Sequence, residues 1–132
     1  MTTGKKTVLV VDDDREMTTI LQKVLVRENY DVLTAENGDE AVKLMKSRPA
    51  EVVIADWKMP VCDGMRLIEV LRKGFPSARI IMITAFGEVD TYIDAMSRGA
   101  FEFLSKPLNI DELKTLVGRA MAGGEPPRAA AL

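Results

Sequence analysis

The chain has 132 residues, of which 47% are hydrophobic and 29% charged, and its formal net charge is −2. This length and composition are typical of one soluble globular domain with a substantial hydrophobic core. The small negative charge gives no electrostatic reason to expect direct binding of nucleic acid. No apolar stretch approaches the ~18 residues of a membrane span, so we expect no membrane contact. The single cysteine, Cys62, cannot form an internal disulfide, and we therefore expect the protein in the reducing cytoplasm.

The chain contains no histidine. This absence excludes catalytic triads and metal sites that use histidine, and it excludes an internal phosphohistidine. If the protein takes part in phosphoryl transfer from histidine, another chain must supply the donor.

Segments typical of buried strands alternate along the chain with segments whose apolar residues recur at helical spacing. In chain order we predict strand 8–11, helix 15–28, strand 31–35, a helix from Gly38 to near Pro49, strand 52–56, a helix from about Gly64 to Gly74, strand 79–84, helix 89–98, strand 101–105 and a helix from 109 or 110 to 121. Five strand–helix units in succession predict an α/β fold with one parallel sheet and helices on both faces. Residues 5–121 are expected to form this domain, and residues 122–132, rich in Gly, Pro and Ala, a flexible tail or truncated linker.

Polar and reactive residues stand where four of these strands end. Asp12 and Asp13 follow the first strand, Asp56 ends the third, Thr84 ends the fourth and Lys106 follows the fifth. The carboxyl ends of parallel strands share one edge of a sheet, and ligands bind where the strand order reverses. In a sheet of order 2-1-3-4-5 that point lies between the first and third strands, so the carboxylates are expected to converge there.

The converging groups suit a cation and a phosphoryl group. Neighbouring carboxylates repel one another unless a cation neutralises them, and oxygen ligands without His or Cys favour Mg²⁺, or Mn²⁺, over zinc. Asp56 is a candidate nucleophile that would form an acyl phosphate, while Lys106 and Thr84 could stabilise the phosphoryl oxygens. We interpret Asp14, in contrast, as the N-cap of the first helix.

Four sequence blocks carry a family resemblance. They are Val10-Val11-Asp12-Asp13-Asp14, Asp56-Trp57-Lys58-Met59-Pro60 with Asp63-Gly64, Thr84-Ala85 and Lys106-Pro107. With these blocks in this order, residues 7–121 resemble the receiver domains of two-component response regulators, both chemotaxis regulators and enhancer-dependent regulators. The resemblance implies a flavodoxin-like doubly wound sheet of order 2-1-3-4-5 with five helices.

The resemblance also implies roles for individual residues. Asp56 would be the phosphoacceptor, and Mg²⁺ would be held by Asp12, Asp13, Asp56 and the main-chain carbonyl of Lys58. Thr84 and Lys106 would bind the phosphoryl oxygens, and the Lys106-Pro107 bond is expected to be cis. Phe103 would be the switch aromatic that responds to Thr84, although its pattern fits an ordinary core residue equally well.

The implied protein is a phosphoacceptor switch rather than an enzyme, and it assists its own phosphorylation and autodephosphorylation. A sensor histidine kinase or phosphotransfer protein would supply the phosphoryl group, docking on the first helix. The face formed by the fourth helix, fifth strand and fifth helix would then control an output, through a homodimer or an output domain outside this sequence.

Two other functions fit the residues less well. An aspartyl-phosphate phosphatase of the dehalogenase type would need a second acid two residues after its nucleophile, where Lys58 stands. A flavodoxin-like or dinucleotide-binding module would need a Gly- or hydroxyl-rich phosphate loop after the first strand, and the three aspartates at 12–14 would repel such a phosphate.

Overall fold

In the computed structural model the described residues are 5–56, 64–84, 96–97 and 99–123. Along these residues the elements are β1 (Thr7–Val11), α1 (Arg15–Arg27), β2 (Asp31–Ala35), α2 (Gly38–Ser47), β3 (Val52–Asp56), α3 (Gly64–Gly74), β4 (Arg79–Thr84), β5 (Glu102–Ser105) and α5 (Ile110–Met121). The five strands form one parallel sheet of order β2-β1-β3-β4-β5. The predicted doubly wound α/β fold and its strand order are therefore confirmed.

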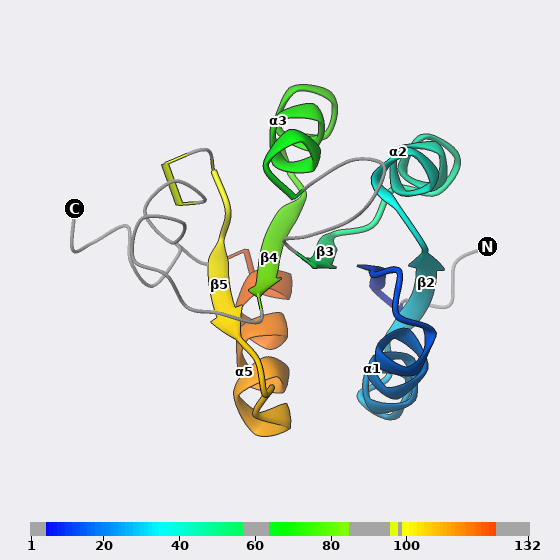
Figure 1. The fold of residues 1–132 in the computed structure, drawn as a ribbon, viewed down its shortest axis with the longest axis vertical. Helices are drawn as coiled ribbons and strands as arrows, with labels where there is room; N and C mark the ends of the chain where they lie inside the picture. Colours follow the sequence, from blue (N-terminus) through cyan, green and yellow to red (C-terminus); the bar gives the residue numbers. More distant parts are fainter. Residues whose placement is uncertain (1–4, 57–63, 85–95, 98, 124–132) are drawn as a thin grey trace.

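Helices cover both faces of the sheet, with α2 and α3 on one side and α1 and α5 on the other (Figure 1). Alternate residues of each strand point to opposite faces, so the core has two layers. In β1, Leu9 and Val11 belong to the cluster beneath α2 and α3, whereas Val8 and Val10 belong to the cluster beneath α1 and α5. Because both faces are covered, the inner strands β1, β3 and β4 are apolar except at their ends, instead of alternating with polar residues.

The helices begin where short polar side chains satisfy free main-chain N–H groups. The Asp14 carboxylate accepts hydrogen bonds from the main-chain N–H groups of Glu16, at 3.0 Å, and Met17, at 3.4 Å, which confirms its predicted role as the N-cap of α1. Asn37 and Asn109 cap α2 and α5 in the same way. These caps fix the orientation of the helices relative to the strand ends that precede them.

Three sequence predictions concern the segment from residue 89 to residue 107. Most of predicted helix 89–98 lies outside the described residues; Met96 and Ser97 are helical, and Gly99 has the positive φ, +110°, expected of a residue that ends a helix. The prediction that the last strand begins at Phe101 is wrong by one residue, although the Phe101 N–H still donates to the Ile80 carbonyl at 2.7 Å. The Lys106-Pro107 bond is cis, as the resemblance implied.

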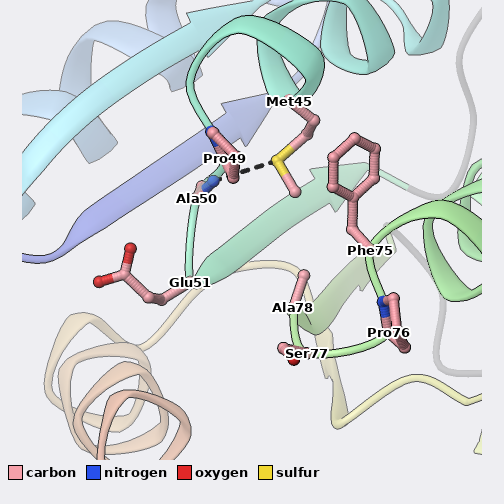
Figure 2. A pocket seen from close by; sticks show the side chains of 8 residues that line it. All are labelled: Met45, Pro49, Ala50, Glu51, Phe75, Pro76, Ser77 and Ala78. Carbon is pink, nitrogen blue, oxygen red and sulfur yellow. Dashed lines mark hydrogen bonds between the residues drawn. The ribbon is translucent and has the colours of Figure 1, made fainter.

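An apolar pocket of about 300 Å³ opens at the edge of the sheet where β3 and β4 begin (Figure 2). Met45 of α2 lines one side together with Pro49, Ala50 and Glu51, and the loop residues Phe75, Pro76, Ser77 and Ala78 line the other. The Met45 sulfur accepts a hydrogen bond from the Ala50 N–H at 3.3 Å, which ties the end of α2 to the start of β3. Among the described residues, no helix is long and apolar enough to cross a membrane.

Candidate functional site

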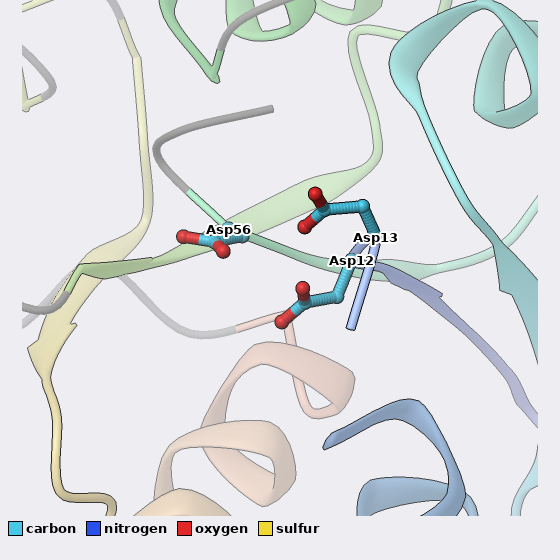
Figure 3. Close-up of side chains that lie close together, drawn as sticks. All are labelled: Asp12, Asp13 and Asp56. Carbon is cyan, nitrogen blue, oxygen red and sulfur yellow. The ribbon is translucent and has the colours of Figure 1, made fainter. Parts of the chain in front are cut away.

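Three carboxylates meet at the carboxyl ends of β1 and β3 (Figure 3). Asp12 and Asp13 directly follow β1, and Asp56 is the last residue of β3. One carboxylate oxygen from each lies within 4.8 Å of the others. These two strands are neighbours in the sheet and flank the point where the strand order reverses. The convergence predicted from the strand ends is therefore present in the structure.

The Asp12 carboxylate is held rigidly in a buried position. Only 3% of the residue is exposed, and its main-chain N–H donates to the Ala35 carbonyl at 3.0 Å, which continues the β1–β2 pairing by one residue. Its Oδ1 accepts a hydrogen bond from the Asp14 N–H at 2.9 Å. Asp13 is exposed and Asp56 is half-buried, so the carboxylates form a site that is closed on the Asp12 side and open on the Asp13 side.

Burial raises the pKa of Asp12 from 3.8 to about 6. The hydrogen bond from the Asp14 N–H opposes this rise, the negative charges of Asp56 and Asp13 add to it, and the positive charge of Lys106 also opposes it. A carboxylate that is desolvated beside two others is the environment in which a bound divalent cation gains most. The donor set, oxygen atoms without nitrogen or sulfur among the described residues, fits Mg²⁺.

Thr84, at the end of β4, and Lys106, directly after β5, stand at the same edge of the sheet as the carboxylates. The Lys106 Nζ lies 3.5 Å from Asp56 Oδ2, and the two side chains are 26% and 13% exposed. The Lys106 main-chain N–H donates to the Thr84 carbonyl at 2.6 Å, so these two residues are held together at the ends of adjacent strands. Thr84 is buried, with 5% of its surface exposed. Lys106 therefore contacts the Asp56 carboxylate, and Thr84 stands at the end of β4, the strand next to β3.

Phe103 lies on the same face of the sheet as Thr84. Phe103 pairs with Met82 in the parallel register, and Thr84 follows Met82 by two residues, so the three side chains point to one side. Phe103 is 8% exposed and belongs to the cluster beneath α2 and α3. This placement suits an inward switch aromatic and an ordinary core residue alike.

The Lys58 carbonyl, predicted as a metal ligand, lies outside the described residues and stays a prediction. The direct ion pair between Lys106 and Asp56 was not predicted, because 50 positions separate the two residues in the sequence and only the pairing of β3, β4 and β5 brings them together.

Comparison with known proteins agrees with this geometry. The model of the response regulator receiver domain matches residues 8–118. The DNA-binding transcriptional regulator NtrC of Salmonella typhimurium strain LT2 is 35% identical over 115 residues, which are 87% of this chain and 24% of that protein.

Two solved structures extend the likeness to three dimensions. The beryllofluoride-activated NtrC4 receiver domain dimer has a TM-score of 0.82 and 35% identity over 89% of this chain and 98% of that one. The response regulator TrrA of Thermotoga maritima, in complex with Mg²⁺ and BeF, has a TM-score of 0.79 and 36% identity over 87% of this chain and 98% of that one.

The family match, together with the sheet order and the acidic site at its carboxyl edge, identifies a signalling domain of the two-component type. The chain belongs to the response-regulator receiver family. It spans about a quarter of the length of the first curated relatives that it matches, which are regulators such as NtrC and PilR.

Proposed function

We propose that this domain accepts a phosphoryl group on Asp56 from a partner sensor histidine kinase or phosphotransfer protein, in a reaction that needs Mg²⁺. The observation that carries the proposal is the position of the Asp56 carboxylate. It shares a potential metal site with Asp12 and Asp13, and its Oδ2 lies 3.5 Å from the Lys106 ammonium group. These 132 residues contain no histidine, so the phosphohistidine donor would lie outside this domain.

In the proposed reaction an Asp56 carboxylate oxygen attacks the phosphorus of the donor. The new O–P bond forms as the P–N bond of the donor phosphohistidine breaks, and the electron pair of that bond stays on the imidazole. Lys106 moves its contact from the carboxylate to a phosphoryl oxygen, and the Thr84 hydroxyl donates to another. A bound Mg²⁺ would be held by Asp12, Asp13, Asp56 and the Lys58 carbonyl, and would neutralise charge on the transferred group; Mn²⁺ has the same ligand preferences.

The same groups support loss of the phosphoryl group by hydrolysis. A water molecule would attack the phosphorus of the acyl phosphate, the O–P bond to Asp56 would break, and the Asp56 carboxylate and inorganic phosphate would be released. The domain would thus assist both its phosphorylation and its autodephosphorylation and act as a switch rather than as an enzyme with a separate substrate. The dehalogenase-type phosphatase gains no support, because Lys58 occupies the position two residues after Asp56 where such an enzyme would need a second acid.

The proposed output begins at Thr84. Contact between its side chain and the phosphoryl group would draw Thr84 and the residues after β4 toward Asp56. Phe103 lies on the same face of the adjacent strand, so its ring would repack as Thr84 moves, and the face made by the fourth helix, β5 and α5 would change shape. That face would bind a second copy of the domain or an output domain, α1 would dock the kinase, and the protein would work in the cytoplasm.

The test uses a small-molecule phosphodonor with Mg²⁺ and measures the intact mass of the protein. We expect the gain of one phosphoryl group in the wild type and its loss when EDTA is present. Asp56→Asn should remove the modification and Asp14→Asn, which preserves the helix cap, should retain it. Phosphorylation that persists in Asp56→Asn at the wild-type rate would refute the assignment.

A further inference from the structure

The end of α5 lies at the edge of the sheet opposite the carboxylates, where β1 and β4 begin. Helix ends leave main-chain carbonyls without partners inside the helix. Here two cations from other elements reach them: the Lys6 Nζ donates to the Met121 carbonyl at 2.7 Å, and the Arg79 Nη2 donates to the Gly123 carbonyl at 3.0 Å. Lys6 directly precedes β1, and Arg79 is the first residue of β4.

The helix end itself is closed by the main chain. The Ala122 N–H donates to the Gly118 carbonyl at 3.1 Å, and the Gly123 N–H donates to the Ala120 carbonyl at 3.2 Å. Gly123 has φ of +74°, the left-handed conformation that ends many helices. Positive side chains at a helix C-terminus are also favoured by the helix dipole. The carbonyls of Met121 and Gly123 thus point outward to donors that α5 itself does not provide.

The direction of Arg79 is set by the core. Its guanidinium carbon lies 6.0 Å from the centre of the Phe101 ring, within the range of a cation–π contact. Phe101 is 2% exposed and belongs to the cluster beneath α1 and α5. The Arg79 Nε is buried and has no hydrogen-bond partner among the described residues. The guanidinium is therefore oriented by the ring and by the Gly123 carbonyl.

We propose that Lys6 and Arg79 are positioning residues that hold the end of α5 to the starts of β1 and β4. They fix the position and orientation of Gly123, the last described residue of the chain. Gly123 thus lies beside Arg79, at the opposite end of β4 from Thr84. This inference does not rest on the phosphoryl chemistry proposed for Asp56, because it concerns the resting contacts of the other edge of the sheet.

The test compares Arg79→Met, Lys6→Met and Arg119→Met in the full 132-residue chain. Arg79→Met keeps an unbranched apolar stem that can pack on Phe101 and removes the donor. Arg119→Met is the matched control, since it removes one positive charge from the last turn of the same helix but neither of the two described contacts. Amide exchange with water is measured by magnetisation-transfer NMR, and the amide-vector orientations by residual dipolar couplings.

In Arg79→Met and Lys6→Met, the Ala122 and Gly123 amides should exchange about tenfold faster, the effect of one lost charge-assisted hydrogen bond. Their dipolar couplings should shift, while those of β4 stay at the wild-type values. Arg79→Lys should restore part of both properties. Values for the Lys6 and Arg79 variants equal to those of Arg119→Met would refute the proposal, as would faster exchange spread evenly through the sheet. If Arg79→Met fails to fold, Lys6→Met decides, because Lys6 is exposed and outside the core.

Discussion

Asp12→Asn should make the domain more stable when no divalent cation is bound. The substitution replaces a carboxylate that is only 3% exposed by an amide of nearly the same shape. The Asn oxygen can still accept the hydrogen bond that the Asp14 N–H now gives to Asp12 Oδ1 at 2.9 Å. What is lost is the cost of holding a buried negative charge close to Asp56 and Asp13.

The size of the gain follows from the pKa of Asp12. Burial, reinforced by the neighbouring carboxylates, raises it from 3.8 to about 6. A rise of about two units at ~1.4 kcal/mol each corresponds to ~3 kcal/mol at neutral pH. Burial of the Asn amide is also unfavourable, although less so than burial of a charge. We therefore expect Asp12→Asn to raise the free energy of unfolding by about 2 kcal/mol, or the melting temperature by roughly 5–10 °C for a domain of this size.

The sign of the pH dependence provides a second constraint. The folded state binds the Asp12 proton more tightly than the unfolded state, so this residue lowers stability as pH rises from about 4 through about 6. The advantage of Asp12→Asn over the wild type should therefore be full at pH 7.5 and disappear near pH 4.

The assay is urea denaturation in EDTA and again with excess Mg²⁺, at both pH values. Asp14→Asn serves as the control, because Asn caps a helix as well as Asp does and its stability should stay close to that of the wild type. Mg²⁺ should stabilise the wild type and the control much more than Asp12→Asn. A wild type as stable as Asp12→Asn in EDTA at pH 7.5 would show that the carboxylate cluster carries no electrostatic cost.

Three further predictions concern Gly99, Asn109 and metal affinity. Gly99→Ala should destabilise the fold by about 1–3 kcal/mol, because φ is +110° and the new Cβ would lie 2.8 Å from Arg72 Nε. Gly74→Ala is the control and should change stability little, since its new Cβ would have no neighbour within 4 Å; thermal denaturation measures both variants. Asn109→Ala should cost about 1 kcal/mol in urea denaturation, since it removes the acceptor of the Glu112 N–H, and Asn109→Asp should restore it. Mg²⁺ affinity, measured by calorimetry, should fall as pH drops below about 6 and Asp12 binds a proton; equal affinity at pH 7.5 and 5 would contradict this.

Most strand and helix positions could be predicted because local chemistry and tertiary structure agree. The apolar runs are short and bounded by turn residues, and the caps Asp14, Asn37 and Asn109 stand where the helical spacing begins. The start of β5 was missed by one residue, since Phe101 is as apolar as Phe103 and Leu104 within the strand. Its main-chain geometry, which the sequence does not encode locally, excludes it from the strand.

The residues of the carboxylate site could be predicted from the sequence, but the burial and the pKa of each carboxylate could not. Asp12 and Asp13 are identical and adjacent, yet one is buried and the other exposed. The difference arises because β1 continues its pairing with β2 through Asp12, by the hydrogen bond to Ala35, and leaves the sheet at Asp13. No sequence pattern distinguishes them, so the raised pKa of Asp12 emerged only from the fold.

The packing of β4 limits how the domain can respond to a change at its carboxyl edge. Ile80 and Met82 are embedded in the layer beneath α2 and α3, and Ile81 and Ile83 in the layer beneath α1 and α5. Rotation of this strand about its own axis would pull apolar side chains out of both layers at once, at a cost of several kcal/mol. A slide along the strand would in addition break its register with β3 and β5, so any displacement of Thr84 is confined to its own side chain and the residues that follow.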